Sequence, residues 1–187
     1  MSTRYFKNKN IKSMFSQGFC EQQEAQFLTW LECSKACGET LKDDRKAILL
    51  RSQFDDKDLV VKHYKHIGVM YALIHAFTKS RAQYSWRASL KMAAVNVPTP
   101  RALACVEHRR YGVVYESYFI YEYEEGIPFR TYAWSTPIET ILAEPILHQV
   151  YRVLRTLKIH KVSHGDLKTS NIIVTEDGPI LIDLDQV

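Results

Sequence analysis

Long apolar runs are missing from this chain of 187 residues. The longest candidate, residues 67–77, contains His75 and is too short to cross a bilayer. The first residues are polar and basic and lack the apolar segment of a secretory signal. We therefore expect a cytoplasmic protein with no membrane-spanning helix.

Cysteine is also scarce. The four cysteines show none of the paired spacings of a zinc ribbon or a disulfide framework. Cys33 and Cys37 are separated by three residues. This spacing hints at a zinc or redox pair, but it also places two side chains on one face of a helix. The helical interpretation is the one we prefer.

Acidic residues are absent from Leu59 to Val106, where the chain carries a local charge of +7 within a net charge of +4. A positively charged stretch attracts anions, such as nucleotide phosphates, a phosphorylated substrate or an anionic membrane surface. The alternative is a solvated helix face without a partner. The cations of this stretch are Lys62, Lys65, Lys79, Arg81, Arg87, Lys91 and Arg101.

A hydrophobic content of 46% is sufficient for a globular core, and the apolar pattern changes along the chain between helical and strand periods. Residues 1–13 are polar, and we expect them to form a loosely docked terminus. The predicted order is a helix over 15–37, strands near 41, 47–50 and 59–64, a helical region over 69–94, strands over 101–105 and 118–123, a hinge at 124–126 and a helix over 136–160.

The chemistry is concentrated in His164-Gly165-Asp166-Leu167-Lys168-Thr169-Ser170-Asn171 and in Asp183, twelve residues after Asn171. This order matches the kinase pattern H-R-D-L-x-x-x-N followed by D-F-G, with Gly for Arg and Leu-Asp for Phe-Gly. The two apolar runs between Asn171 and Asp183 flank an Asp-Gly turn, which predicts a β-hairpin. The hairpin would carry Asn171 at one open end and Asp183 at the other.

The chain resembles the protein-kinase-like superfamily and, within it, the bacterial lipopolysaccharide kinase family (Kdo/WaaP-like, InaA-like). The narrower resemblance covers about residues 38–187. It implies an α+β, two-lobed fold with a small five-stranded antiparallel N-lobe, one main helix and the start of a helical C-lobe. The segments that carry it are Val60 to Tyr64, Ser80 to Arg87, Val97 to Arg101, Tyr118 to Gly126 and His164 to Asp185.

The expected domains are a helical extension over 1–37, a kinase-like N-lobe over 38–124 and a C-lobe over 125–187 whose remainder is absent. The resemblance implies ATP and Mg²⁺ as cofactors. Lys62, Glu122 and Tyr123 would bind the nucleotide. Asp166 would orient and deprotonate the acceptor hydroxyl, with Lys168 beside the transferred phosphoryl group. Asn171 and Asp183 would hold the metal, His164 would support the loop, and Asp185 would either join the metal site or cap a turn.

The pattern departs from ordinary kinases at two points before the catalytic loop. No glycine-rich turn precedes Lys62, because the corresponding turn reads Lys42-Asp43-Asp44-Arg45. The helix after Lys62 also lacks the usual glutamate, so its polar candidates for a lysine partner are Gln83 and Ser85. Phosphate cradling and the orientation of Lys62 therefore need another explanation.

Three functions fit these residues. The resemblance implies phosphorylation of a sugar hydroxyl in the lipopolysaccharide inner core, with an anionic glycolipid as substrate, peripheral contact with the inner membrane and no nucleic acid partner. An atypical protein kinase of the RIO or Bud32 type shares the His-Gly-Asp loop. A nucleotide-binding pseudokinase of the stress response would explain the missing glutamate and glycine turn, although Asp166, Asn171 and Asp183 are all present.

Overall fold

The computed structural model describes residues 3–8, 10–19, 23–65, 78–143 and 145–187. The chain divides into two compact units, which are described separately below. The first comprises Met1–Trp86 and Arg101–Tyr123, and the second comprises Arg87–Pro100 and Glu124–Val187. The second unit thus takes Arg87–Pro100, which the sequence assigned to the N-lobe.

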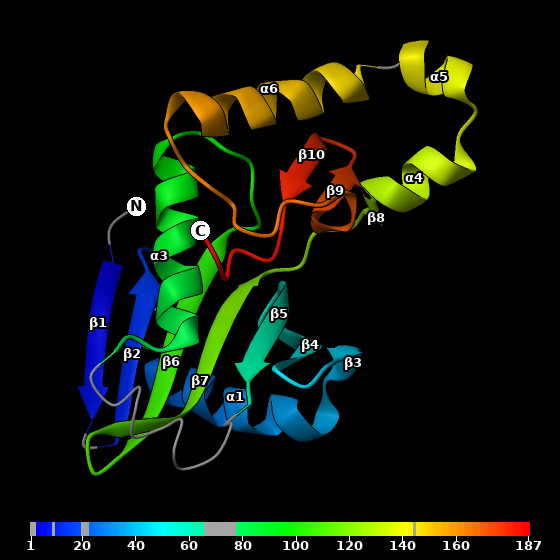
Figure 1. Cartoon of the computed structure of the whole chain (residues 1–187). Helices are drawn as coiled ribbons and strands as arrows, with labels where there is room; N and C mark the ends of the chain where they lie inside the picture. Colours follow the sequence, from blue (N-terminus) through cyan, green and yellow to red (C-terminus); the bar gives the residue numbers. More distant parts are fainter. Residues whose placement is uncertain (1–2, 9, 20–22, 66–77, 144) are drawn as a thin grey trace. The chain divides into compact units, whose positions relative to one another are not determined.

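An antiparallel sheet of seven strands forms the first unit, in the order β1-β2-β6-β7-β5-β4-β3 (Figure 1). Its central strand β7 pairs with β5 on one side and β6 on the other. The strands are β1 Thr3–Asn8, β2 Ile11–Ser16, β3 Glu39–Asp43, β4 Ala47–Phe54, β5 Lys57–Tyr64, β6 Ala102–Arg110 and β7 Val113–Glu122. The five strands expected from the sequence are all present.

The two additional strands correct the prediction for the N-terminus. Residues that we expected to be a loose end form a β-hairpin, with β1 antiparallel to β2. The hairpin extends the sheet because β2 pairs with β6 and buries Met14 and Phe15. Strand β1 lies at the edge of the sheet and is largely exposed. Most of its residues are therefore polar, and the alternation of apolar and polar residues that identifies a strand is missing. The predicted helix accordingly starts later, as α1 Glu24–Cys37.

Helix α1 and one face of the sheet enclose the main core of the first unit. Phe27 packs against Phe15 and Phe54 with ring centroids 5.5 and 5.2 Å apart. Leu59 and Val61 of β5 are fully buried in the same cluster. Because side chains alternate across a strand, Val60, Lys62 and Tyr64 lie on the opposite face.

The helical region predicted over 69–94 is described only in its second half, as α3 Arg81–Ala94. The first half falls largely on residues 66–77, which lie outside the described residues. No helix among the described residues is long and apolar enough to cross a membrane.

The second unit has helices packed on a small sheet of three strands, in the order β10-β9-β8. The helix predicted over 136–160 is interrupted: Pro137 and Pro145 directly precede two separate helices, in agreement with the preference of proline for a first turn. A short helix before them was not predicted. The elements are β8 Ile127–Pro128, α4 Phe129–Ser135, α5 Ile138–Ala143, α6 Ile146–Ile159, β9 Ile172–Thr175 and β10 Gly178–Leu181.

The core of the second unit lies between α6 and the β9–β10 hairpin. Val153 and Leu157 of α6 pack with Ile172, Leu181 and other apolar residues. The hairpin is present as the sequence predicts, with Gly178 opposite Thr175 and Leu181 opposite Ile172. The α+β class with a kinase-like first sheet is confirmed. Because the hairpin packs against α6, the segments that flank it are held in place.

Candidate active site

Lys62 is the central cation of the first unit's candidate site. It lies on β5 opposite Phe119 of β7, and only 7% of its surface is exposed. Its ammonium group lies 5.4 Å from the centre of the Tyr64 ring. The aliphatic stem of Lys62 is thus buried against the sheet, on the face opposite α1.

The first turns of α3 are tied to the same face by a bond between the Tyr64 hydroxyl and Ser85 Oγ, 2.7 Å apart. Gln83 and Ser85, the two polar candidates for a lysine partner, are both buried. Since α3 contains no acidic residue, it cannot supply the carboxylate that usually orients such a lysine.

Glu122 and Tyr123 occupy the end of β7 and the residue after it. The side chain of Glu122 lies near Lys57 and Arg101, at 3.4 and 3.6 Å. The N–H of Tyr123 donates to the Asp58 carbonyl (2.8 Å), and that of Glu122 donates to the Arg101 carbonyl (3.0 Å). With both N–H groups engaged, the predicted contact with a nucleotide depends on the carbonyl groups of these two residues.

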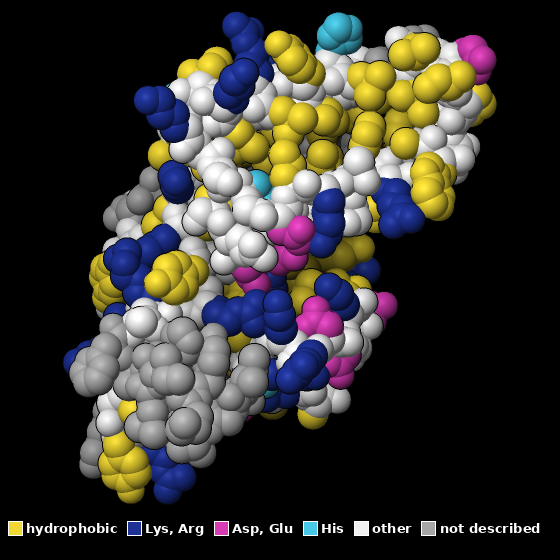
Figure 2. Space-filling model, viewed as in Figure 1, with side chains coloured by type: hydrophobic (Ala, Val, Ile, Leu, Met, Phe, Trp, Pro, Cys, Tyr) yellow, Lys and Arg dark blue, Asp and Glu magenta, His cyan; other side chains and the backbone are white. Residues whose placement is uncertain are grey.

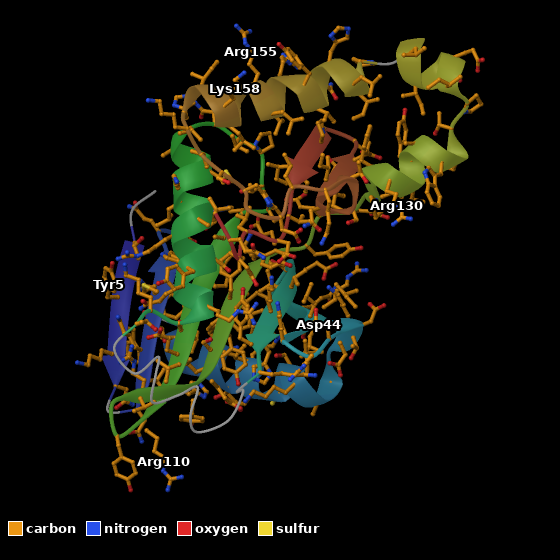
Figure 3. The ribbon with its side chains drawn as sticks, in the orientation of Figure 1. Tyr5, Asp44, Arg110, Arg130, Arg155 and Lys158 are labelled. Atoms are coloured by element: carbon orange, nitrogen blue, oxygen red, sulfur yellow. The ribbon has the colours of Figure 1, made fainter. Side chains whose placement is uncertain are left out.

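The turn between β3 and β4 stands where kinases carry a glycine-rich loop. Figure 3 labels Asp44, which lies in this turn. Its Oδ1 accepts hydrogen bonds from the N–H groups of Lys46 and Ala47, at 2.7 and 2.9 Å. These bonds hold the pKa of the Asp44 carboxyl well below its usual range. The two N–H groups are therefore occupied by a carboxylate and are not available to cradle a phosphate.

The catalytic loop of the second unit contains a close pair formed by Asp166 and Lys168. Lys168 Nζ donates to Asp166 Oδ2 over 2.7 Å. This bond lowers the pKa of Asp166 and raises that of Lys168. Lys168 is exposed and Asp166 partly exposed, so the pair contributes little to stability.

Asn171 holds the two ends of this loop together. Its side-chain Nδ2 donates to the Asp166 backbone carbonyl (2.9 Å) and to Asp166 Oδ2 (3.2 Å). The Asn171 carbonyl in turn accepts the N–H of Ile182 over 3.0 Å. The residue before Asp183 is therefore bonded directly to Asn171, as expected for the open end of the hairpin.

Asp183 lies in the left-handed backbone region, with φ of 63°. That conformation is uncommon for a residue other than glycine and is often found at functional sites. The neighbouring Ile182 carbonyl is held by His164 Nε2 at 3.0 Å. Asp183 also adds to the raised pKa of Lys168, after the larger effect of Asp166. His164 thus supports the Asp183 segment, which agrees with its predicted structural role.

The glycine that replaces the usual arginine of the motif has a local cause. Gly165 has φ of +74°, and a Cβ at this position would lie 2.5 Å from the backbone oxygen of Gln186. Any side chain here would clash with the chain after Asp183 and would be strained as well.

The arrangement suits Mg²⁺, which prefers oxygen ligands and usually takes one or two protein side chains together with phosphates and water. Because Nδ2 of Asn171 is engaged with Asp166, the amide oxygen is the group left for a cation. The described residues contain no cluster of three or more His, Cys, Asp or Glu that could hold a metal alone. The Asn171 amide oxygen and the Asp183 carboxylate are oxygen donors of the kind that Mg²⁺ accepts.

The structure groups the predicted site residues in two sets. Asp166, Lys168 and Asn171 are in direct contact, and Asp183 is attached to them through Ile182. Lys62, Glu122 and Tyr123 belong to the sheet of the other unit. Glu107 of β6, the first acid after the acid-free stretch, is fully buried, which its position in the sequence does not predict.

Known proteins similar to this chain include a curated relative and a solved structure. The EKC/KEOPS complex subunit BUD32 of Debaryomyces hansenii is 26% identical over 129 residues, which are 65% of this chain and 47% of the relative. This chain thus spans about half the length of that relative. The solved structure of WaaP in complex with acyl carrier protein has a TM-score of 0.62 at 16% identity, covering 93% of this chain and 71% of that chain. This likeness shows a shared fold.

The family model gives the most specific result. The lipopolysaccharide kinase (Kdo/WaaP) family matches residues 34–187, which include the sheet from β3 onward, the catalytic loop and the β9–β10 hairpin. The match covers well over half of the chain and includes every predicted site residue. The chain belongs to the lipopolysaccharide kinase (Kdo/WaaP) family.

Proposed function

We propose that the protein transfers the γ-phosphoryl group of ATP to a sugar hydroxyl of the lipopolysaccharide inner core, on Kdo or heptose. The observation that carries the proposal is the bonded group of Asp166, Lys168 and Asn171 with Asp183 attached. Family membership supports the choice of a lipopolysaccharide acceptor.

Each side chain has a distinct task in this proposal. Asp166 orients the acceptor hydroxyl and takes its proton. Its hydrogen bond with Lys168 lowers the pKa of Asp166 and holds the carboxylate in place. Lys168 neutralises charge on the transferred phosphoryl group. Asn171 and Asp183 would hold Mg²⁺, which would neutralise the nucleotide phosphates. Lys62, with the backbone of Glu122 and Tyr123, binds the nucleotide.

The acceptor is tested by incubating the protein with Mg-ATP and either unphosphorylated inner-core lipopolysaccharide or a bacterial protein extract. We expect mass spectrometry to show a gain of one phosphate on the core sugar. Phosphate on protein alone would instead support a Bud32-like protein kinase. The similarity to BUD32 gives that second candidate its support, while the absence of an acid from α3 argues against it. ATP binding with neither product would support a pseudokinase.

We also propose peripheral contact with an anionic membrane surface through the acid-free stretch. Four cations of this stretch are set aside. Lys62 is assigned to the nucleotide, Lys65 pairs with Asp43 and Arg101 lies near Glu122. The Arg81 guanidinium lies 4.7 Å from the centre of the Tyr64 ring and donates to the Lys46 carbonyl. Lys79, Arg87 and Lys91 are exposed and remain as candidates. Figure 2 shows Lys and Arg side chains over α6 as well, where Figure 3 labels Arg155 and Lys158.

Reversing Lys79, Arg87 and Lys91 to Glu should weaken binding to anionic vesicles by at least about 100-fold, since each cation near such a surface is worth about 1 kcal/mol. Binding of the parent protein should also fall with salt because screening shortens to ~8 Å at physiological ionic strength. Co-sedimentation with anionic and neutral vesicles measures both effects.

The matched control reverses Arg152, Arg155 and Lys158 on α6, which changes the net charge equally. Equal losses in the two triple variants would mean that net charge and not the α3 region controls association. Equal binding to neutral and anionic vesicles would remove the proposed contact altogether.

A further inference from the structure

A groove of about 480 Å³ lies within the second unit, between α6, strand β10 and the loop that follows α3. The loop is joined to the strand because the Leu181 N–H donates to the Pro98 carbonyl over 2.9 Å. Every residue that lines the groove belongs to this unit, and none belongs to the catalytic loop. A volume of this size is in the range of ligand pockets in proteins. The groove is therefore a candidate binding site that the catalytic groups do not occupy.

Helix α6 forms one wall of the groove and lies above the β9–β10 hairpin in Figure 1. Gln149, Arg152 and Val153 of this wall are spaced by three or four residues, so they share one face of the helix. Val153 is buried in the core of the unit, whereas Arg152 is exposed. This wall thus combines an apolar base with a polar rim.

The turn and the second strand of the hairpin form the opposite wall. Gly178 has φ of +120°, and a Cβ at this position would lie 3.3 Å from Gln149 Oε1. The amide of Gln149 thus lies close over the turn, where a side chain at residue 178 would crowd it. Asp177 is exposed on one side of Gly178, and Pro179 is buried on the other. This wall therefore also presents a polar group beside an apolar base.

The polar side chains that line the groove include a cation, an anion and two amides. They are Arg152, Asp177, Asn96 and Gln149. In the part of the chain that the structure describes, none of these four side chains forms a hydrogen bond or an ion pair. Arg152 can only donate, Asp177 can only accept, and the two amides can do both. Since the two formal charges cancel, the groove suits a neutral ligand that both donates and accepts hydrogen bonds.

A sugar ring has this combination of properties. Each of its hydroxyl groups donates and accepts, so one ring can bind the guanidinium, the carboxylate and the amides together. Its C–H face can lie against the apolar base, which Val153, Pro179 and Ile180 provide. An anionic ligand would be repelled by Asp177 and a cationic one by Arg152.

The groove is separate from the site of phosphoryl transfer. Strand β9 has four residues, so about 13 Å of chain separates Asn171 at its start from the hairpin turn at its end. A sugar in the groove is therefore not the one whose hydroxyl meets Asp166, although both places belong to the same unit.

We infer that the groove is a saccharide-binding subsite, which holds a neutral sugar of the acceptor while another sugar of the same oligosaccharide is phosphorylated at the catalytic loop. The assignment of the sugar to the acceptor rests on the lipopolysaccharide kinase activity given under Proposed function.

The kinetic test uses the full chain and unphosphorylated inner-core oligosaccharide released from lipopolysaccharide. Arg152→Met should raise the KM for the oligosaccharide about tenfold, the effect of losing a hydrogen bond from a charged group. The kcat and the KM for Mg-ATP should stay within about twofold of the parent, because the subsite does not touch the reacting atoms. Gln149→Leu should raise the KM for the oligosaccharide about threefold, since a neutral donor and acceptor are lost.

Arg155→Met is the matched control. Arg155, labelled in Figure 3, is exposed on the same helix and lies outside the groove, so its replacement changes the net charge equally. We expect the parental KM for the oligosaccharide in this variant.

Amide NMR signals locate the bound oligosaccharide directly. Titration should shift the signals of Gln149 and Gly178 as well as that of Asn171, and a glucose trimer should shift none of them. Shifts at Asn171 without shifts at Gln149 and Gly178 would overturn the subsite. A glucose trimer that binds the groove as tightly would overturn its assignment to the acceptor.

The outcomes separate this inference from the function on which it rests. A parental KM in Arg152→Met, or an equal rise in Arg155→Met, would overturn the subsite and leave the kinase activity in place. Shifts of the Gln149 and Gly178 signals without phosphate transfer to the oligosaccharide would overturn the proposed function and leave a saccharide site in the groove.

Discussion

Replacing Asp166 by Ala should reduce phosphoryl transfer by about 10²–10⁴-fold, the usual contribution of a general base. Nucleotide affinity should change only a few-fold, because Asp166 acts on the acceptor. The loop should keep its shape, since Asn171 Nδ2 also donates to the Asp166 backbone carbonyl, a bond that the substitution leaves in place. Single-turnover transfer from labelled ATP to the acceptor, together with a binding titration, measures both quantities.

Glu176→Ala is the matched control for this prediction. Glu176 is an exposed acid in the turn of the β9–β10 hairpin of the same unit, so its removal changes the net charge equally. We expect parental transfer rates in this variant. A rate for Asp166→Ala within a few-fold of the parent would remove Asp166 from the mechanism.

Replacing Asp183 by Asn should weaken Mg-ATP binding by about 2 kcal/mol, or roughly 30-fold, because a formal charge is removed next to a divalent cation. The left-handed backbone at φ of 63° should survive, since Asn tolerates that region as well as Asp does. Calorimetric titration of the protein with Mg-ATP measures the loss.

The decisive comparison repeats this titration without magnesium. Metal-free ATP should bind Asp183→Asn at least as well as the parent, because the substitution removes a charge of the same sign as the phosphates. An equal loss with and without magnesium would contradict the metal role of Asp183. Asp185→Asn, measured in parallel, decides whether Asp185 contributes to the metal site: a magnesium-dependent loss would include it, and parental affinity would leave it as a turn residue.

The catalytic hairpin could be predicted from local sequence because its chemistry is local. Asn171 and Asp183 are separated by two apolar strands and an Asp-Gly turn, so strand pairing alone brings their ends together. The bond between the Ile182 N–H and the Asn171 carbonyl follows from that pairing. Local sequence did not predict the strand Thr3–Asn8, because its polar side chains show no strand period. Its partner β2 is held in the sheet by pairing with β6, which is distant in the sequence.

The sequence by itself determined the family, the order of the catalytic groups and the strands around Lys62, since these depend on spacing, on residue type and on the period of apolar side chains. Only the tertiary structure decided which side chains share a face or an environment. It placed Glu107 in register with Tyr64 across β7. It also bonded the Lys46 N–H to the Asp44 carboxylate and brought Gln186 against Gly165. These relations depend on strand register and on contacts between distant segments, which no local pattern encodes.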